Sequence, residues 1–134
     1  ENLMSEFRKV FQYVQFSVPT PIQWAMADFL TEKEHYLSLS AFYQRKRDLF
    51  EDYLAQSRFK PLSSSGTYFQ CADYSAISKG SDMKFVEKLT KKHGVAAIPI
   101  SSFFKGGDDQ KIIRFCFAKN EETLHKAGEL LCKI

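Results

Sequence analysis

The sequence predicts an α/β (α+β-like) fold: a small mixed β-sheet with helices packed on one face, preceded by helices that belong to another part of the molecule. Apolar residues recur at helical spacing through the first third of the chain. Short alternating runs then separate helical stretches through the second half. With 134 residues, 44% of them hydrophobic, the chain can bury one globular core but is too short for two complete domains.

The first expected helix covers residues 5–14. Its apolar residues fall on one face while charged and amide side chains fall on the other, so this helix needs an apolar partner. Pro19 cannot continue it, because proline removes a backbone donor and restricts the residue before it. The apolar face comprises Phe7, Val10, Phe11 and Val14.

A second helix is expected to begin at Pro21. Thr20 can cap it, Pro21 suits the first helical position, and Gln23 completes a capping box. A buried stripe is expected along one side of this helix. It consists of Ile22, Ala25, Met26 and Phe29.

A third helix is predicted from a cap at Ser40 to about Gln56. Its periodicity gives it a core face and a polar face. The core face consists of Phe42, Leu49, Phe50, Tyr53 and Leu54, and the residues expected outside are Arg45, Lys46, Arg47 and Asp48.

The character of the chain changes after this helix. Residues 59–62 and 67–71 are short aromatic runs separated by a serine- and glycine-rich turn, which indicates two strands. A helix from Asp82 to His93 follows, with Phe85, Val86 and Leu89 inward, and Gly94 is typical of a left-handed residue that ends a helix.

The last part of the chain contains two further expected strands and a closing helix. Residues 95–98 form a short buried strand ended by Pro99, and 106–109 form a turn. The second strand covers 112–117. Asn120 caps a helix from Glu121 to Lys133, and its inward residues are Leu124, Ala127 and Leu131.

Composition excludes several classes of function. The net charge of +3 arises from 19 basic and 16 acidic residues spread along the chain, which does not favour a nucleic-acid or membrane surface. The three cysteines, without CxxC spacing, favour a reducing cytoplasm over a disulfide framework or a zinc site. The histidines lie far apart, so no metal site is expected. They are His35, His93 and His125.

Arg114 is the candidate with the clearest chemistry. Strand alternation places it on the face opposite Ile113, Phe115 and Phe117. A rigid strand suits a planar guanidinium that binds a carboxylate through two parallel hydrogen bonds. From the residues alone, an arginine on the solvent face of an edge strand is the other interpretation.

Five motifs occur in the order seen in one enzyme family. They are residues 16–23 (FSVPTPIQ), 42–48 (FYQRKRD), 66–69 (GTYF), 93–101 (HGVAAIPIS) and 113–119 (IRFCFAK). In the order and spacing of these five motifs, the chain resembles the class I and II, fold-type I aminotransferases, which use pyridoxal 5′-phosphate (PLP). The resemblance is greatest to the methionine and kynurenine aminotransferase branch and covers essentially the whole sequence.

The resemblance implies a role for two residues. Arg114 would bind the α-carboxylate of the amino acid, and Phe16 would approach its side chain. The lysine and the other groups that hold PLP in the family would precede residue 1, so no catalytic or cofactor-binding residue is expected in this chain. We therefore expect a piece of a longer protein.

The resemblance also implies a division of the chain. Residues 1–39 would be a helical segment from the end of the PLP-binding large domain, and residues 40–134 the C-terminal small domain, including an interdomain helix at 40–56. The complete enzyme would be a cytoplasmic homodimer. It would transfer the amino group of methionine or an aromatic, kynurenine-like amino acid to a 2-oxo acid.

Two other functions are compatible with the residues. One is a non-enzymatic, small-molecule-binding or regulatory α/β domain, which the missing lysine favours. The other is an RNA-binding sheet, because aromatic residues on adjacent strands can stack with bases. The small net charge and the absence of the RNP-type glycine disfavour the second.

Overall fold

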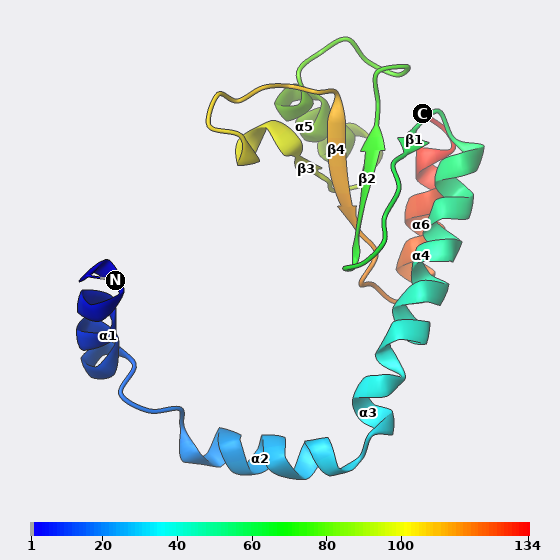
Figure 1. The fold of residues 1–134 in the computed structure, drawn as a ribbon. Coiled ribbons are helices and arrows are strands. Elements are labelled where there is room, and N and C mark those ends of the chain that lie inside the picture. Colours follow the sequence, from blue (N-terminus) through cyan, green and yellow to red (C-terminus); the bar gives the residue numbers. More distant parts are fainter. Residues whose placement is uncertain (1) are drawn as a thin grey trace. The chain divides into compact units, whose positions relative to one another are not determined.

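The computed structural model describes residues 2–134, and the chain divides into two compact units. One unit ends at Leu39, and the other comprises Ser40–Ile134. Figure 1 gives the order of the helices and strands. In the described part of the chain, no helix is both long and apolar enough to cross a membrane.

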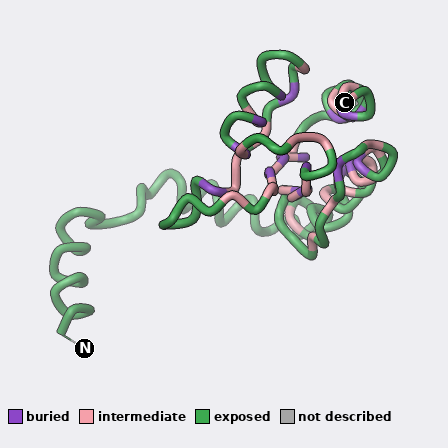
Figure 2. The backbone as a smooth tube through the Cα atoms, turned by 90° about the horizontal axis from the view of Figure 1, so that it is seen from above, coloured by how far each residue is buried: buried purple, intermediate pink, exposed green. Residues whose placement is uncertain are grey.

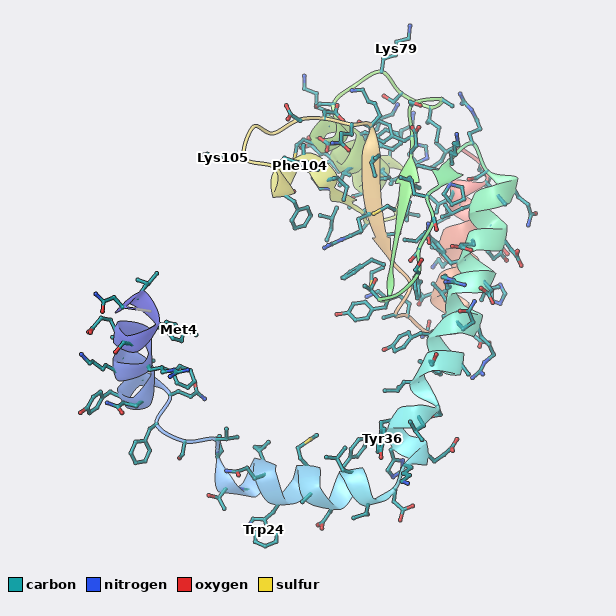
Figure 3. The ribbon with its side chains drawn as sticks, in the orientation of Figure 1. Met4, Trp24, Tyr36, Lys79, Phe104 and Lys105 are labelled. Carbon is teal, nitrogen blue, oxygen red and sulfur yellow. The ribbon has the colours of Figure 1, made fainter. Side chains whose placement is uncertain are left out.

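The first unit is entirely helical. It contains α1 (Asn2–Val14), α2 (Thr20–Thr31) and α3 (Glu34–Leu37). None of these helices has a buried residue, and Figure 2 shows almost the whole unit in the colour of exposed residues. Trp24, for example, projects away from α2 in Figure 3. The predicted stripe of Ile22, Met26 and Phe29 is therefore not buried among the described residues.

The start of α2 differs from the sequence prediction. Helix α2 begins at Thr20 itself, Pro19 occupies the cap position, and no side chain caps the helix. Gln23 does not close a capping box, since its Nε2 donates to the carbonyl oxygen of Val18 at 2.7 Å. The capping-box prediction is wrong, although Pro21 does lie in the first turn as expected.

The second unit is built around a four-stranded sheet of order β1-β2-β4-β3 in the described residues. Each of the three strand pairings is antiparallel, so the expectation of a mixed sheet is corrected, while the α/β (α+β-like) fold class is confirmed. The alternation of strands and helices in the sequence suggested some parallel pairs. Strands separated by a helix or a long loop can nevertheless pair antiparallel when the connection reverses the direction of the chain. The strands are β1 (Lys60–Pro61), β2 (Phe69–Asp73), β3 (Ile98–Pro99) and β4 (Ile112–Cys116).

One face of this sheet packs against helices. Strand alternation directs Ala72, Ile113 and Phe115 into the core, where the Phe115 ring contacts those of Phe50 and Phe59 edge-on. The opposite face carries half-buried residues. The helical elements of this unit are α4 (Leu39–Gln56), α5 (Asp82–His93), η1 (Ile100–Phe103, a 3₁₀ turn) and α6 (Glu121–Leu131).

Three local predictions are corrected in this unit. Ser40 lies inside α4, which begins at Leu39, so Ser40 is not a cap. Lys46 was expected outside but is only 8% exposed, because its Nζ donates to the carbonyl of Lys119 and lies over the Phe42 ring. The strand expected at 95–98 shortens to Ile98–Pro99.

Other local predictions are confirmed. Helix α5 has the expected bounds, and Gly94 follows it with a φ of 72°, the left-handed conformation that favours glycine. The Asn120 side chain accepts a hydrogen bond from the Thr123 amide at 2.8 Å and so caps α6.

Candidate carboxylate-binding site

Arg114 lies in the middle of β4, an interior strand of the sheet. Its neighbours Ile113 and Phe115 point into the core, so the arginine must point to the opposite, half-buried face. The edge-strand alternative is therefore wrong. The register places Cys71 of β2 on one side of Arg114 and Ile98 of β3 on the other.

Two aromatic rings flank the Arg114 guanidinium. Its Cζ lies 4.0 Å from the ring centroid of Phe69 and 4.8 Å from that of Phe103. Phe69 belongs to β2, one neighbour of β4, and Phe103 belongs to η1, the turn that directly follows β3, the other neighbour. Both contacts are cation–π interactions, which favour a cation over the ring face.

The guanidinium has no acidic partner among residues 2–134. Its Nε is buried and makes no hydrogen bond there, whereas its two terminal nitrogens are not among the buried, unbonded atoms. An arginine that is always charged and lacks a carboxylate partner provides binding capacity for an anion. The terminal nitrogens are the ones open to such a ligand.

The Cys71 thiol does not serve as that anion. Burial raises its pKa, and the nearby charge of Arg114 only partly opposes this effect. A cysteine with a raised pKa remains a neutral thiol at neutral pH. The region around Arg114 is therefore formed by aromatic rings, a neutral thiol and an aliphatic side chain.

A buried carboxylate fixes the turn that carries Phe103. Both oxygens of Asp82, at the start of α5, bind Ser101 of η1: one accepts from its amide and the other from its hydroxyl, each at 2.8 Å. The amide of Met83 donates to the same Asp82 carboxylate. Asp82 and Ser101 are buried, so these hydrogen bonds are protected from water.

Phe16, the other candidate site residue, belongs to the first unit. It follows α1, is 89% exposed and has a φ of 55°, a conformation that non-glycine residues rarely adopt. Strained backbone of this kind is common at functional sites. Phe16 and Arg114 thus lie in different units, and each is described within its own.

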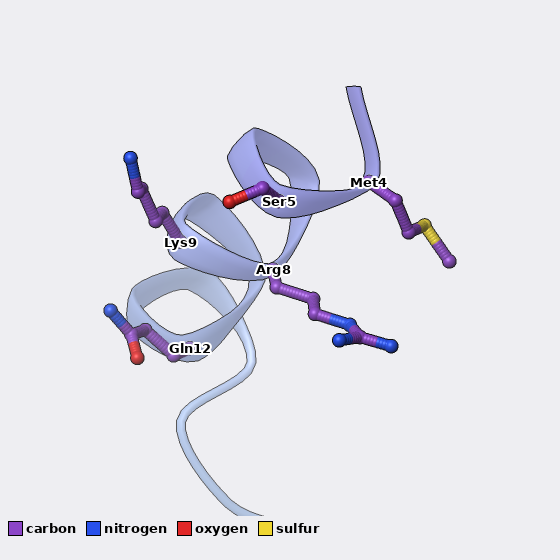
Figure 4. Close-up of a pocket in the computed structure, with 5 residues that line it drawn as sticks. All are labelled: Met4, Ser5, Arg8, Lys9 and Gln12. Carbon is purple, nitrogen blue, oxygen red and sulfur yellow. The ribbon is translucent and has the colours of Figure 1, made fainter. Parts of the chain in front are cut away.

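The histidines, the cysteines and the surface hollows of the described residues were also considered as sites. Among the described residues, no three side chains of His, Cys, Asp or Glu are placed to hold a metal ion, and all three cysteines are free. A hollow of about 420 Å³ lies along α1 (Figure 4), but exposed side chains of this one helix form it. They are Met4, Ser5, Arg8, Lys9 and Gln12.

The profile of the family described as aminotransferase class I and II matches residues 2–131, nearly the whole sequence. The chain belongs to the class I and II aminotransferases. It is 51% identical to a methionine aminotransferase of Escherichia coli (strain K12), over 96% of this chain and 34% of that protein. A kynurenine–oxoglutarate transaminase of Dictyostelium discoideum is 35% identical, over 99% of this chain and 36% of that protein.

A solved aminotransferase structure agrees with these relatives. YbdL from Escherichia coli, whose structure and reactivity identify a methionine aminotransferase function, matches with a TM-score of 0.90 and 50% identity. The match covers 97% of this chain and 35% of that one. The chain thus spans about a third of the length of the aminotransferases that it resembles.

Two of the described lysines of this aminotransferase chain are shielded from solvent. Among the described residues Lys46 is the only buried lysine, and its amino group is bound to a backbone carbonyl. Lys111 is half-buried and pairs with Asp109. The candidate site in the described residues is Arg114 with its two flanking rings. Phe103 and Asp82 were not predicted as parts of it, because only the fold brings η1 beside β4.

Proposed function

We propose that this chain is the C-terminal part of a PLP-dependent aminotransferase and that Arg114 binds the α-carboxylate of its amino-acid substrate. The observation that carries this proposal is the guanidinium on the open face of the sheet without an acidic partner in the described residues. Its planar terminal nitrogens can form two parallel hydrogen bonds with a carboxylate.

The proposed reaction transfers an amino group from methionine or an aromatic, kynurenine-like amino acid to a 2-oxo acid. The names of the relatives support this choice of substrates. PLP, bound by other parts of the complete enzyme, supplies the electron sink for that chemistry. This chain anchors the carboxylate, and with one end of the substrate fixed, the reacting bonds are held in a limited set of orientations.

The same proposal covers the organisation of the protein. Residues 1–39 would be part of the PLP-binding large domain and residues 40–134 the small domain, with 40–56 as the interdomain helix. The apolar residues exposed on α1 and α2 support this division, since such stripes normally pack against another layer. A cytoplasmic homodimer, as in the family, completes the proposal, and the free cysteines are compatible with that compartment.

Replacing Arg114 in the complete enzyme tests the carboxylate assignment. Arg114→Lys keeps the charge but loses the two-point grip, so it should weaken the use of every amino acid, and Arg114→Ala should do so more severely. Truncating a desolvated charged pair costs about 2–5 kcal/mol, so kcat/KM should fall at least about tenfold with every substrate.

The PLP absorbance spectrum and the melting temperature serve as controls and should not change. A normal kcat/KM for Arg114→Ala would remove Arg114 from the site. Tight, specific binding of an amino acid to the 134-residue chain alone would instead favour the non-enzymatic, small-molecule-binding domain.

A further inference from the structure

Resting on the proposed function, we infer that Phe103 is a positioning residue, which sets the plane of the Arg114 guanidinium for the incoming carboxylate. A side chain that binds a ligand needs its orientation fixed by packing and by hydrogen bonds from neighbouring groups. Arg114 makes none within residues 2–134, and its Nε is buried without a partner. Among the described residues, contact with the two rings is therefore what holds its orientation.

The rings of Phe69 and Phe103 differ in their structural roles. Phe69 is a residue of β2, and its backbone pairs with that of Cys116, so it has a structural role in the sheet as well as its contact with Arg114. Phe103 lies on η1 and is 59% exposed, far more than a core residue. A phenylalanine this exposed contributes little to the core of the second unit, so within that unit its contact with the cation is its main interaction.

The backbone around Phe103 is held firmly enough for this task. The buried Asp82 carboxylate binds both the amide and the hydroxyl of Ser101, two residues earlier. The pairing of Ile98 with Arg114 fixes the strand from which η1 continues. The turn is thus tied to α5 and to β4, and the Phe103 ring remains 4.8 Å from the guanidinium carbon.

A comparison of four variants in the complete enzyme isolates the ring. Phe103→Leu keeps an apolar side chain but removes the π face, whereas Phe103→Tyr keeps that face. Phe104→Leu makes the same exchange at the next residue, which makes no cation–π contact with Arg114. Arg114→Ala reports on the carboxylate site itself. Since Phe103 is largely exposed within the described residues, its variants should leave the core of the second unit intact, and Phe103→Met repeats the comparison if Phe103→Leu does not fold.

The probe is 4-(methylthio)butanoate, a carboxylate with the side chain of methionine and no amino group, and its Kd is measured by calorimetry. Phe103→Leu should weaken binding about three- to tenfold, the range of a partly exposed cation–π contact. Phe103→Tyr and Phe104→Leu should stay close to the wild type. In turnover assays, Phe103→Leu should raise KM more than it lowers kcat, since chemistry at the cofactor is untouched.

The outcomes separate this inference from the proposed function. Unchanged probe binding in Phe103→Leu, with binding lost in Arg114→Ala, would overturn the positioning role and leave the carboxylate site intact. Equal losses in Phe103→Leu and Phe103→Tyr would also overturn it, because the π face would then be irrelevant. Probe binding that survives in Arg114→Ala would instead refute the proposed function.

Discussion

Phe16 has a backbone conformation that costs free energy. A non-glycine residue in the left-handed region is disfavoured by about 1–3 kcal/mol, and such residues persist where the surrounding structure or a function requires them. Pro19, three residues later, restricts the chain that follows. The Phe16 ring is 89% exposed, so packing within the described unit does not account for the strain.

We expect Phe16 to contact the substrate side chain in the complete enzyme. Phe16→Ala should therefore reduce kcat/KM selectively for large apolar amino acids, because an apolar contact discriminates between substrates by about 1–3 kcal/mol. Steady-state kinetics with methionine, phenylalanine and alanine measure this selectivity. Equal losses with all three would mean that Phe16 only supports the fold.

The sequence predicted Arg114 and Phe16 as candidates but not Phe103. The face of Arg114 follows from alternation along one strand, a purely local property. The contact between Phe103 and Arg114 depends on the β3–β4 register and on the 3₁₀ turn at η1, neither of which leaves a periodic signal in the sequence. Phe103 was therefore indistinguishable from the other aromatic residues around it.

At the scale of elements, α4 and α6 approach each other closely at Gly128. A Cβ built on Gly128 would lie 2.2 Å from Cγ of the Tyr53 ring, far inside van der Waals contact. Because the Tyr53 ring is half-buried and the clash is at its first ring carbon, Gly128→Ala should separate the helices and lower the free energy of unfolding by about 1–3 kcal/mol.

Chemical denaturation measures this loss. Gly66→Ala is the matched control, since nothing lies within 4 Å of a Cβ at that position and its φ does not require glycine. Similar stability for the two variants would show that α4 and α6 adjust to each other without cost.

Asp109 links a loop to the start of α5 and should give the fold a pH dependence. Burial alone would raise its pKa, but hydrogen bonds from Lys111 and the amide of Asp82, with the charge of Lys111, bring it below the ordinary value of 3.8. A lowered pKa in the folded state contributes stability above 3.8, and this contribution is lost as pH falls through the folded value.

Asp109→Asn should therefore be less stable than the wild type near neutral pH, and the difference should shrink below about pH 4. Urea unfolding of both proteins across this range measures the change. A stability difference that stays constant with pH would mean that the carboxylate charge is not what the loop requires.

Local signals predicted some helix ends and failed at others. Asn120 and Gly94 succeeded because each acts on its own helix end through its own side chain or φ value. Thr20 and Ser40 were equally suitable in sequence, yet each became a helical residue. In both cases the helix starts one or two residues earlier than expected, within the usual uncertainty of a helix boundary.

At the scale of the whole molecule, the chain should not bind PLP covalently on its own. Mixed with PLP, it should give no stoichiometric internal aldimine, because Lys46 is bound to a carbonyl and the other described lysines are not in an enclosed site. The visible spectrum, borohydride reduction and peptide mapping provide the test. A stoichiometric product on one lysine would contradict the proposed division of labour between this chain and the rest of the enzyme.

The sequence predicted the fold of the second unit better than the environment of the first. Periodicity gave α1 and α2 an apolar face each, but the expected burial of Ile22 and Met26 is not found in the described residues. A pattern shows which side of a helix is apolar, not which part of a protein covers it. In contrast, the core residues of α5 and α6 find their partners within the same unit.

Strand β4 carries the core on one face and the candidate site on the other, with a repeat of two residues. Deleting or inserting one residue within Ile112–Cys116 would turn Arg114 toward the helices and an aromatic side chain toward the ligand. Substitutions can alter the two faces independently, but a shift of register cannot. Substitutions on the outer face of β4 can therefore change the candidate site without disturbing the core. An insertion or deletion within β4 would disrupt both at once.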